Sequence, residues 1–259
     1  MDTSPQALQK EGESLDELLD GGLKILQKTS GYRFSIDALL LAHFCRLRQG
    51  ERVLDLGTGS AVIPLLLARR WEGVQLIGID VQEKFVDMAR RSIDLNGLSE
   101  RIEIRLGDVR HIEAHFEARS FDAVVFNPPY RRSGSGRINR DDQKALARHE
   151  IKGTLADFLA AAAYVLKEGC RCYVIYPASR AVELLFRMRR DRLEPKRLRM
   201  VHSRAGSEGQ FVLAEGIREG GEELAVLAPL FIYEEGGGYT AEMEGLFKDL
   251  SASLRTASG

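Results

Sequence analysis

The chain has 259 residues, of which 44% are hydrophobic and 29% are charged, and its formal net charge is −1. This length is sufficient for one large domain or two small ones, and the composition excludes a disordered chain and a small disulfide scaffold. The three cysteines, Cys45, Cys170 and Cys172, form no Cys-x-x-Cys pair, so we expect reduced thiols and no metal site.

No apolar stretch is long enough for a membrane helix. The longest candidate, residues 158–166, falls short of the ~20 apolar residues that a span requires. The first 20 residues are rich in Asp and Glu, which is the reverse of a secretory or mitochondrial leader. We therefore expect no membrane span and a cytoplasmic location.

Strand and helix patterns alternate from about residue 50 to residue 190. Asn96-Gly97 predicts a helix end, and Thr154 with Asp157 predicts a capping box at a helix start. Such alternation builds a parallel sheet that is covered on both faces. The expected strands are residues 53–56, 76–79, 102–106, 121–126 and 172–176, and the expected helices are residues 63–68, 84–95, 154–166 and 178–190.

The pattern changes beyond residue 195, where the helices are expected to stop. Residues 197–202, 211–217 and 230–233 are expected to form strands joined by glycine-rich turns, which predicts an antiparallel edge. The fold class is therefore α/β, with a doubly wound, mainly parallel seven-stranded sheet and an antiparallel C-terminal edge. Residues 51–250 are expected to form this domain, residues 1–50 an N-terminal extension of it, and residues 251–259 a loose tail.

The first strand leads into a glycine turn, Asp-Leu-Gly-Thr-Gly-Ser-Ala at residues 55–61. Glycines at this point let the backbone approach a ligand closely. A dinucleotide fingerprint requires a third glycine, and Val62 stands in that position. A Gly-x-Gly turn that follows Asp55, with Asp80 at the end of the next strand, resembles the cofactor site of class I S-adenosylmethionine methyltransferases.

That resemblance implies a role for each residue of the cofactor site. Asp80 would bind the ribose hydroxyls, and Asp108, in Leu-Gly-Asp at residues 106–108, would bind the adenine amino group. Gly57 and Gly59 would form the turn beside the cofactor, and Asp55 would lie near its amino-bearing methionine end. An Asp that ends a strand is also common as a turn or N-cap residue.

The fourth strand ends in Asn127-Pro128-Pro129-Tyr130, a sequence that also fits a rigid turn. It resembles the methyltransferases that act on a planar nitrogen of adenine, guanine or glutamine. Such a nitrogen is a weak nucleophile, and the Asn127 side-chain oxygen and the Pro128 carbonyl would accept its two N–H bonds and orient its lone pair. Tyr130 would stack on a flipped base. No general base is required, because the methylated nitrogen is acidic enough to lose a proton to water.

Two further segments extend the resemblance over roughly residues 20–235. They are Gly-Tyr-Arg-Phe-Ser-Ile-Asp-Ala-Leu-Leu-Leu-Ala at residues 31–42 and Ala-Arg-His-Glu at residues 147–150. The combination resembles the bacterial tRNA(Val) adenine N6-methyltransferase family. By this resemblance Arg33 and Asp37 would help to hold the methionine end of the cofactor, although the segment also fits a simple docking helix. His149 is either an RNA contact or a surface residue at a helix start.

Positive charge is concentrated in two segments although the whole chain is nearly neutral. Residues 131–152 contain seven Lys and Arg residues against three Asp and Glu residues, and residues 180–204 contain nine against three. Clusters of this kind fit a phosphate backbone, and Arg131, Arg132 and Arg137 follow the tetrapeptide directly. The second segment also fits a solvated, arginine-rich helix face.

The expected function is S-adenosylmethionine-dependent N6-methylation of an adenine in tRNA, with the adenine 3′ of the tRNA(Val) anticodon as the target that the resemblance implies. A protein glutamine N5-methyltransferase and an rRNA guanine N2-methyltransferase are the alternatives. The glutamine enzymes have a larger helical N-terminal domain, whereas the guanine enzymes fit the basic segments as well. DNA methyltransferases need a target-reading domain for which this chain has little room, and an inactive RNA-binding module would not bind the cofactor.

Overall fold

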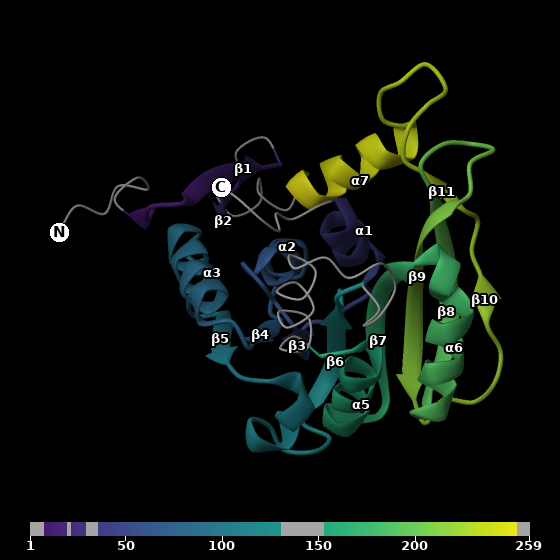
Figure 1. The fold of residues 1–259 in the computed structure, drawn as a ribbon, viewed down its shortest axis with the longest axis horizontal. Coiled ribbons are helices and arrows are strands. Elements are labelled where there is room, and N and C mark those ends of the chain that lie inside the picture. The colour runs from purple at the N-terminus through teal and green to yellow at the C-terminus, as the bar shows by residue number, and fades with distance from the viewer. Residues whose placement is uncertain (1–7, 20–21, 30–35, 131–152, 253–259) are drawn as a thin grey trace, which may run out of the picture.

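A computed structural model describes residues 8–19, 22–29, 36–130 and 153–252. Its centre is one twisted sheet with helices on both faces (Figure 1). Within these residues the sheet has nine strands in the order β10-β8-β9-β7-β6-β3-β4-β5, and β11 also pairs with β8. The strands are β3 (Arg52–Leu56), β4 (Gln75–Asp80), β5 (Ile102–Leu106), β6 (Phe121–Phe126), β7 (Leu166–Pro177), β8 (Leu193–His202), β9 (Gly209–Arg218), β10 (Ala225–Val226) and β11 (Leu230–Phe231).

The predicted fold class is confirmed. Strands β3 to β7 pair in parallel, and β9 runs antiparallel to both β7 and β8, which forms the expected antiparallel edge. Seven of the strands have five residues or more, and the two-residue strands β10 and β11 add parallel pairs to β8. Because β9 runs antiparallel to β8, a short connection at residues 203–208 joins the two strands, and β9 lies between β7 and β8.

The strand side chains divide the core between the two faces of the sheet. In β6, Ala123 and Val125 belong to the cluster on one face, and Val124 and Phe126 belong to the cluster on the other. Strands that are buried on both faces produce the continuous apolar runs of the sequence. Helices α1 (Ile36–Phe44), α2 (Val62–Arg70), α3 (Glu83–Leu95) and α7 (Ala241–Ala252) contribute to the first cluster, and η2 (Val109–Ala114), α5 (Leu155–Val165) and α6 (Ala181–Arg190) contribute to the second.

The predicted helix ends are confirmed where local signals set them. The Thr154 hydroxyl and the Asp157 carboxylate satisfy each other's backbone N–H groups at the start of α5. Gly97 has φ +64° directly after α3, and the N–H of Leu98 bonds back to the carbonyl of Ile93. Both ends depend on residues within five positions of each other, so the sequence was sufficient to predict them.

Three expectations about the C-terminal half are wrong. Helices do not stop at residue 195, because α7 buries Met243, Leu246 and Leu250 at helical spacing. The glycine-rich loop before α7 made this segment resemble the preceding turns. The helix predicted at 178–190 begins at Ala181, after the short 3-10 turn η3 (Ala178–Arg180), and the strand predicted at 230–233 ends at Phe231.

The N-terminal residues contain a hairpin that the sequence did not predict. Strands β1 (Glu13–Leu18) and β2 (Leu23–Lys28) pair antiparallel, and β2 packs on α3 (Figure 1). Leu26 joins Phe85 and Met88 in a small apolar cluster, and Arg91 forms an ion pair with Glu13. Ser251 and Ala252 belong to α7, and the rest of the predicted tail, residues 253–259, lies outside the described residues. No helix in the described ranges is long and apolar enough to cross a membrane.

Candidate functional site

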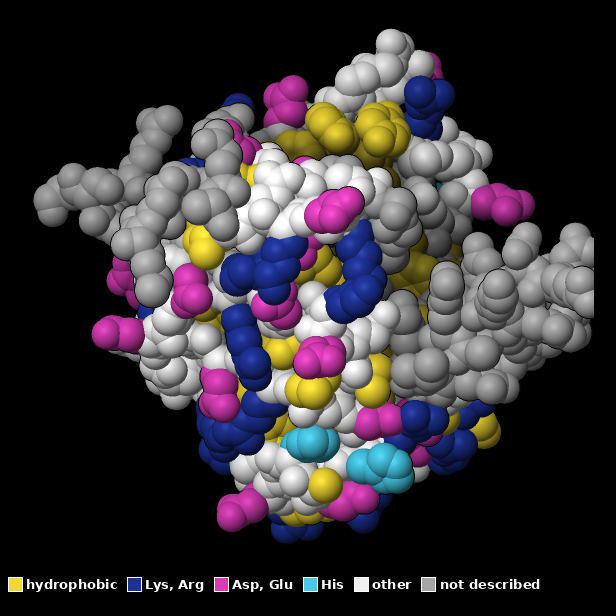
Figure 2. All heavy atoms as spheres, turned by 60° about the vertical axis from the view of Figure 1, so that its left-hand side comes forward, with side chains coloured by type: hydrophobic (Ala, Val, Ile, Leu, Met, Phe, Trp, Pro, Cys, Tyr) yellow, Lys and Arg dark blue, Asp and Glu magenta, His cyan; other side chains and the backbone are white. Residues whose placement is uncertain are grey.

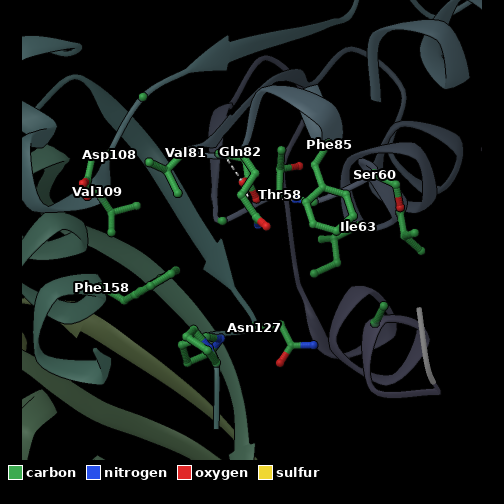
Figure 3. Close-up of a pocket in the computed structure, with 18 of the residues that line it drawn as sticks. Thr58, Ser60, Ile63, Val81, Gln82, Phe85, Asp108, Val109, Asn127 and Phe158 are labelled. Atoms are coloured by element: carbon green, nitrogen blue, oxygen red, sulfur yellow. Dashed lines mark hydrogen bonds between the residues drawn. The ribbon is translucent and has the colours of Figure 1, made fainter. Parts of the chain in front are cut away.

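A pocket of ≈ 330 Å³ lies at the carboxyl ends of β3, β4, β5 and β6. This edge is where ligands bind in open α/β sheets, and the volume is within the range of small-molecule sites. Figure 3 shows Asp108 and Val109 on one side of the pocket, Phe85 and Ile63 on the other, and Asn127 and Phe158 below. The polar residues that line it are Thr58, Ser60, Asp80, Gln82, Asp108, Asn127 and Tyr130.

The glycine turn forms one wall of the pocket and is fixed by the end of β4. The Gly57 N–H donates to the Ile79 carbonyl (2.8 Å), and the Gly59 N–H donates to the Asp80 carboxylate (3.0 Å). Gly57 has φ +70°, and a Cβ there would lie only 3.0 Å from the Phe158 ring. The turn therefore requires glycine at this position both for its backbone conformation and for close packing.

Two carboxylates at the ends of strands face this wall. Asp80 is 7% exposed and also accepts the backbone N–H of Gln82 (2.8 Å). Asp108 accepts the backbone N–H of Arg110 (2.9 Å) and forms an ion pair with its guanidinium (2.5 Å). The hydrogen bonds from Arg110 lower the pKa of Asp108, so this carboxylate is ionised at neutral pH.

Asp55 is buried beside the pocket at the end of β3, with 1% of its surface exposed. Within the described part of the chain, neither of its oxygens accepts a hydrogen bond. The pKa of Asp55 is raised to about 8. Burial is the main cause, the charge of Asp80 adds to it, and the nearby hydroxyl of Thr58 opposes it. A buried carboxyl group in this state is stabilised by a ligand that donates hydrogen bonds or carries positive charge.

The tetrapeptide begins where β6 ends and is bound from two sides. From α1, the Asp37 carboxylate accepts the side-chain N–H of Asn127 (3.0 Å) and the hydroxyl of Tyr130 (3.0 Å). The Tyr130 hydroxyl also lies within hydrogen-bond distance of the Asn127 side-chain oxygen. From η3, Arg180 donates to the Tyr130 carbonyl (2.9 Å).

The Tyr130 ring is part of an aromatic group. It packs edge-on against Tyr176, with ring centroids 5.9 Å apart, and lies 6.1 Å from the Phe211 centroid. The Arg180 guanidinium lies over the Tyr176 ring at 4.8 Å and pairs with Glu183. Contacts from β7, η3 and β9 thus position a side chain that also lines the pocket.

The structure brings most of the sequence-predicted site residues to this edge of the sheet. Asp37 and Asp55 are buried beside the pocket, and the others line it. The residues placed here are Asp37, Asp55, Gly57, Gly59, Asp80, Asp108, Asn127, Pro128 and Tyr130. Arg33, Arg131, Arg132, Arg137 and His149 lie outside the described residues.

Some residues of the site were missed from the sequence. Phe85 and Phe158 line the pocket from α3 and α5, and Arg180 binds the tetrapeptide. An aromatic residue on an apolar helix face predicts core packing, so no local pattern marks the two phenylalanines. The contact between Asp37 and Asn127 joins positions 90 residues apart, and no spacing rule predicts it.

Many charged side chains on the described surface form ion pairs. Figure 2 shows Lys and Arg side chains with Asp and Glu beside them on the face that carries α3. Most arginines of residues 180–204 have acidic partners, several of them from outside that segment. The pairs are Arg187–Glu183, Arg189–Glu194, Arg189–Glu222, Arg190–Asp191, Arg192–Glu219, Arg197–Glu215 and Arg199–Glu242.

Comparison with known sequences places the site in context. Residues 47–210 match the model of a methyltransferase domain family. The chain is 30% identical over 205 residues to a tRNA1(Val) (adenine(37)-N6)-methyltransferase of Aeromonas salmonicida, which covers 79% of this chain and 84% of that protein. It is 29% identical to the protein of the same name from Actinobacillus succinogenes, over 82% of this chain and 87% of that protein.

Solved structures have the same fold. A predicted O-methyltransferase from Agrobacterium tumefaciens superposes with a TM-score of 0.69 at 24% identity, over 83% of this chain and 97% of that one. TrmN from Thermus thermophilus superposes with a TM-score of 0.50 at 23% identity, over 70% of this chain and 48% of that one. These likenesses support the α/β fold described above.

Proposed function

Because this chain belongs to the family of tRNA1(Val) (adenine-N6)-methyltransferases, we propose that it methylates the N6 amino group of an adenine in tRNA. The proposed target is the adenine 3′ of the anticodon of tRNA(Val). The observation that carries the proposal is the position of Asn127: its amide lines the same pocket as the glycine turn and the two strand-end carboxylates. A methyl donor bound in that pocket would lie beside a binding site for the amino group that receives the methyl group.

The residues of the pocket fit S-adenosylmethionine. This cofactor carries a positive sulfonium and an amino group, and the buried Asp55 carboxyl group lacks a full hydrogen-bond partner among the described residues. We assign the ribose hydroxyls to Asp80 and the adenine amino group to Asp108. The turn at Gly57 and Gly59 then faces the methionine end. Arg33 and Asp37 stay predictions for that end, and Asp37 contacts Asn127 and Tyr130 in the structure.

When bound, S-adenosylmethionine supplies an electrophilic methyl group. Asn127 and Pro128 hold the substrate: the side-chain oxygen and the backbone carbonyl each accept one N–H of the amino group. Their two hydrogen bonds direct the nitrogen lone pair and strengthen as positive charge develops on the nitrogen. Proline suits this position because its φ is fixed and it has no N–H to compete. Tyr130 provides an aromatic surface for the base.

We also propose that residues 1–50 extend the domain of residues 51–250 and complete its pocket. Helix α1 contributes Ala38 to the lining, and the hairpin of β1 and β2 packs on Phe85, which also lines the pocket. Lys28 lies over that ring at 4.3 Å from its centroid. Deleting the hairpin should therefore weaken cofactor binding even though none of its residues lines the pocket in the described ranges.

The test is methylation of unmodified tRNA(Val) transcript by the purified protein, with S-adenosylmethionine as donor and nucleoside mass spectrometry of the product. We expect N6-methyladenosine, lost when the adenine 3′ of the anticodon is replaced by guanine. Transcripts of other tRNA species with an adenine at this position measure the species preference. A methyl group on guanine, or transfer only to a protein glutamine, would replace the proposal with one of the alternatives.

A further inference from the structure

The Asp37 carboxylate connects the N-terminal helix α1 to the tetrapeptide. It is 2% exposed, and its Oδ2 accepts both the Asn127 Nδ2 and the Tyr130 hydroxyl at 3.0 Å. Its Oδ1 accepts the backbone N–H of Ala38 (3.0 Å), which fixes the carboxylate relative to the helix. These contacts bind Asp37 to the side of the pocket that would receive the substrate.

The first consequence concerns the orientation of the Asn127 amide. An asparagine amide has a donor end and an acceptor end, and only the oxygen can accept an N–H from a substrate. A carboxylate oxygen accepts hydrogen bonds and has none to donate, so it selects the Nδ2 end of Asn127. The Oδ1 end is thereby turned away from Asp37. One residue thus determines which end of the amide is available.

The second consequence concerns the single hydrogen of the Tyr130 hydroxyl. Among the described residues, Asp37 Oδ2 and Asn127 Oδ1 both lie within its reach, and it can donate to only one of them at a time. When a substrate amino group donates to Asn127 Oδ1, the Tyr130 hydroxyl has Asp37 as its alternative acceptor. The substrate can therefore bind the amide oxygen without leaving the partly buried hydroxyl unsatisfied.

We propose that Asp37 is a positioning residue for methyl transfer, which orients the Asn127 amide and accepts the Tyr130 hydroxyl while the amino group is bound. This inference rests on the proposed function. As the nitrogen lone pair bonds to the methyl carbon and the carbon–sulfur bond breaks, the nitrogen becomes positive, and its excess proton later leaves to water. The negative carboxylate behind Asn127 polarises the amide and favours that charge.

The experiment compares Asp37→Asn with a matched control, Asp122→Asn. The amide introduced by Asp37→Asn would keep the shape of the carboxylate but could donate to Asn127 Oδ1 and occupy it. We expect the single-turnover rate constant to fall by about 10- to 100-fold, with the KM for tRNA(Val) and the Kd for S-adenosylmethionine within about threefold of wild type. Asp122 lies at the other end of β6, where it accepts the Arg52 N–H and pairs with Lys167, so its variant should keep the wild-type rate.

A second variant at the same position tests the proposal even if Asp37→Asn fails to fold. Asp37→Glu keeps the charge and the acceptor character, and we expect it to regain part of the lost rate. A rate for folded Asp37→Asn within threefold of wild type would overturn the proposal. So would a weakened cofactor Kd with an unchanged rate, which would return Asp37 to the methionine end of the cofactor.

A readout without substrate separates this inference from the proposed function. In the cofactor-free protein, the side-chain amide resonances of Asn127 should shift in Asp37→Asn and stay unchanged in Asp122→Asn. If the wild-type protein fails to methylate tRNA but these resonances shift, the proposed function is wrong and the contact between Asp37 and Asn127 holds. Unchanged resonances in Asp37→Asn would overturn the positioning role whatever the substrate is.

Discussion

Two buried carboxyl groups at the same edge of the sheet have opposite surroundings. Asp37, on the side of the tetrapeptide, accepts hydrogen bonds from Ala38, Asn127 and Tyr130. Asp55, on the side of the glycine turn, accepts no hydrogen bond from the described residues, and its pKa is raised to about 8. The side that would bind the target amino group is assembled by the protein alone, whereas the side that would bind the cofactor has a polar group left for a ligand.

This difference indicates how the two sides would contribute to the reaction. Groups that are already oriented cost no reorganisation when charge develops, so the tetrapeptide should affect the rate more than binding. A buried group without a partner gains most from a ligand, so the glycine-turn side should affect cofactor affinity and stability. The following predictions test this division, beginning with the largest expected effect.

Asn127→Ala should reduce the single-turnover rate by about 100- to 1,000-fold, because one preorganised polar contact of this kind has about that value. The variant removes the proposed acceptor for one N–H of the substrate and leaves the glycine turn and strand-end carboxylates intact. Cofactor affinity, measured by calorimetry, and tRNA affinity should change by less than about threefold.

Asn127→Asp provides the contrast to that variant. It keeps an acceptor of the same shape, so part of the activity should remain, but it places a second carboxylate against Asp37. Repulsion between the two should reduce the rate below that of wild type. Near-normal methyl transfer by Asn127→Ala would show that Asn127 has no catalytic role. The proposed division between a side that sets the rate and a side that sets cofactor affinity would then be wrong.

Asp80→Ala should weaken S-adenosylmethionine binding by about 30- to 100-fold, corresponding to about 2 to 3 kcal/mol for a charged hydrogen-bonding group. Its carboxylate also accepts the N–H groups of Gly59 and Gln82, so the glycine turn loses support in the variant. The measurement is titration calorimetry, with Asp122→Asn as the control. Equal affinity for Asp80→Ala and wild type would show that the cofactor binds elsewhere.

Asp55→Asn should change how stability depends on pH. The pKa of Asp55 is about 8 in the folded protein and near 3.8 in the unfolded chain, so the folded state holds the proton more tightly. Its contribution is fully present below about pH 4 and is lost as the pH rises to about 8. Over that window wild type should lose up to about 1.4 kcal/mol per pH unit relative to the variant, a tenfold change in the folding equilibrium constant.

Urea unfolding of cofactor-free protein at about pH 5, about pH 6.5 and about pH 8, which together span this window, measures the slope. Asp122→Asn is again the control. Burial would raise the pKa of Asp122, but hydrogen bonds from Lys167 and Arg52 lower it below its ordinary value, so it does not titrate in this window. Parallel slopes for wild type and Asp55→Asn would mean that Asp55 has a partner in solution and that the two sides of the site do not differ.

The sequence was sufficient for the parts of the site that depend on neighbouring residues. The turn at Gly57 and Gly59, the acid that ends β4 and the capping box at Thr154 are short patterns with local causes. The contacts of Asp37 and Arg180 were not predictable, because they join positions 90, 93 and 50 residues apart. For the same reason residues 180–204 looked strongly basic in the sequence, whereas Glu215, Glu219, Glu222 and Glu242 pair with them in the fold.

The last prediction concerns the salt dependence of tRNA binding and separates the two basic segments. Arg131 and Arg132 follow the proposed catalytic tetrapeptide directly in the sequence, and they lie outside the described residues. Replacing both with Ala should flatten the plot of log K against log salt by about 0.9 for each phosphate that the protein no longer neutralises. Arg189→Ala with Arg190→Ala removes the same charge from residues that already pair with Glu194, Glu222 and Asp191. Arginines that are already paired with carboxylates neutralise few RNA phosphates and so release few counterions. We therefore expect the slope of this second variant to match that of wild type. A flattened slope in the Arg189 and Arg190 variant alone would place the RNA contact on α6.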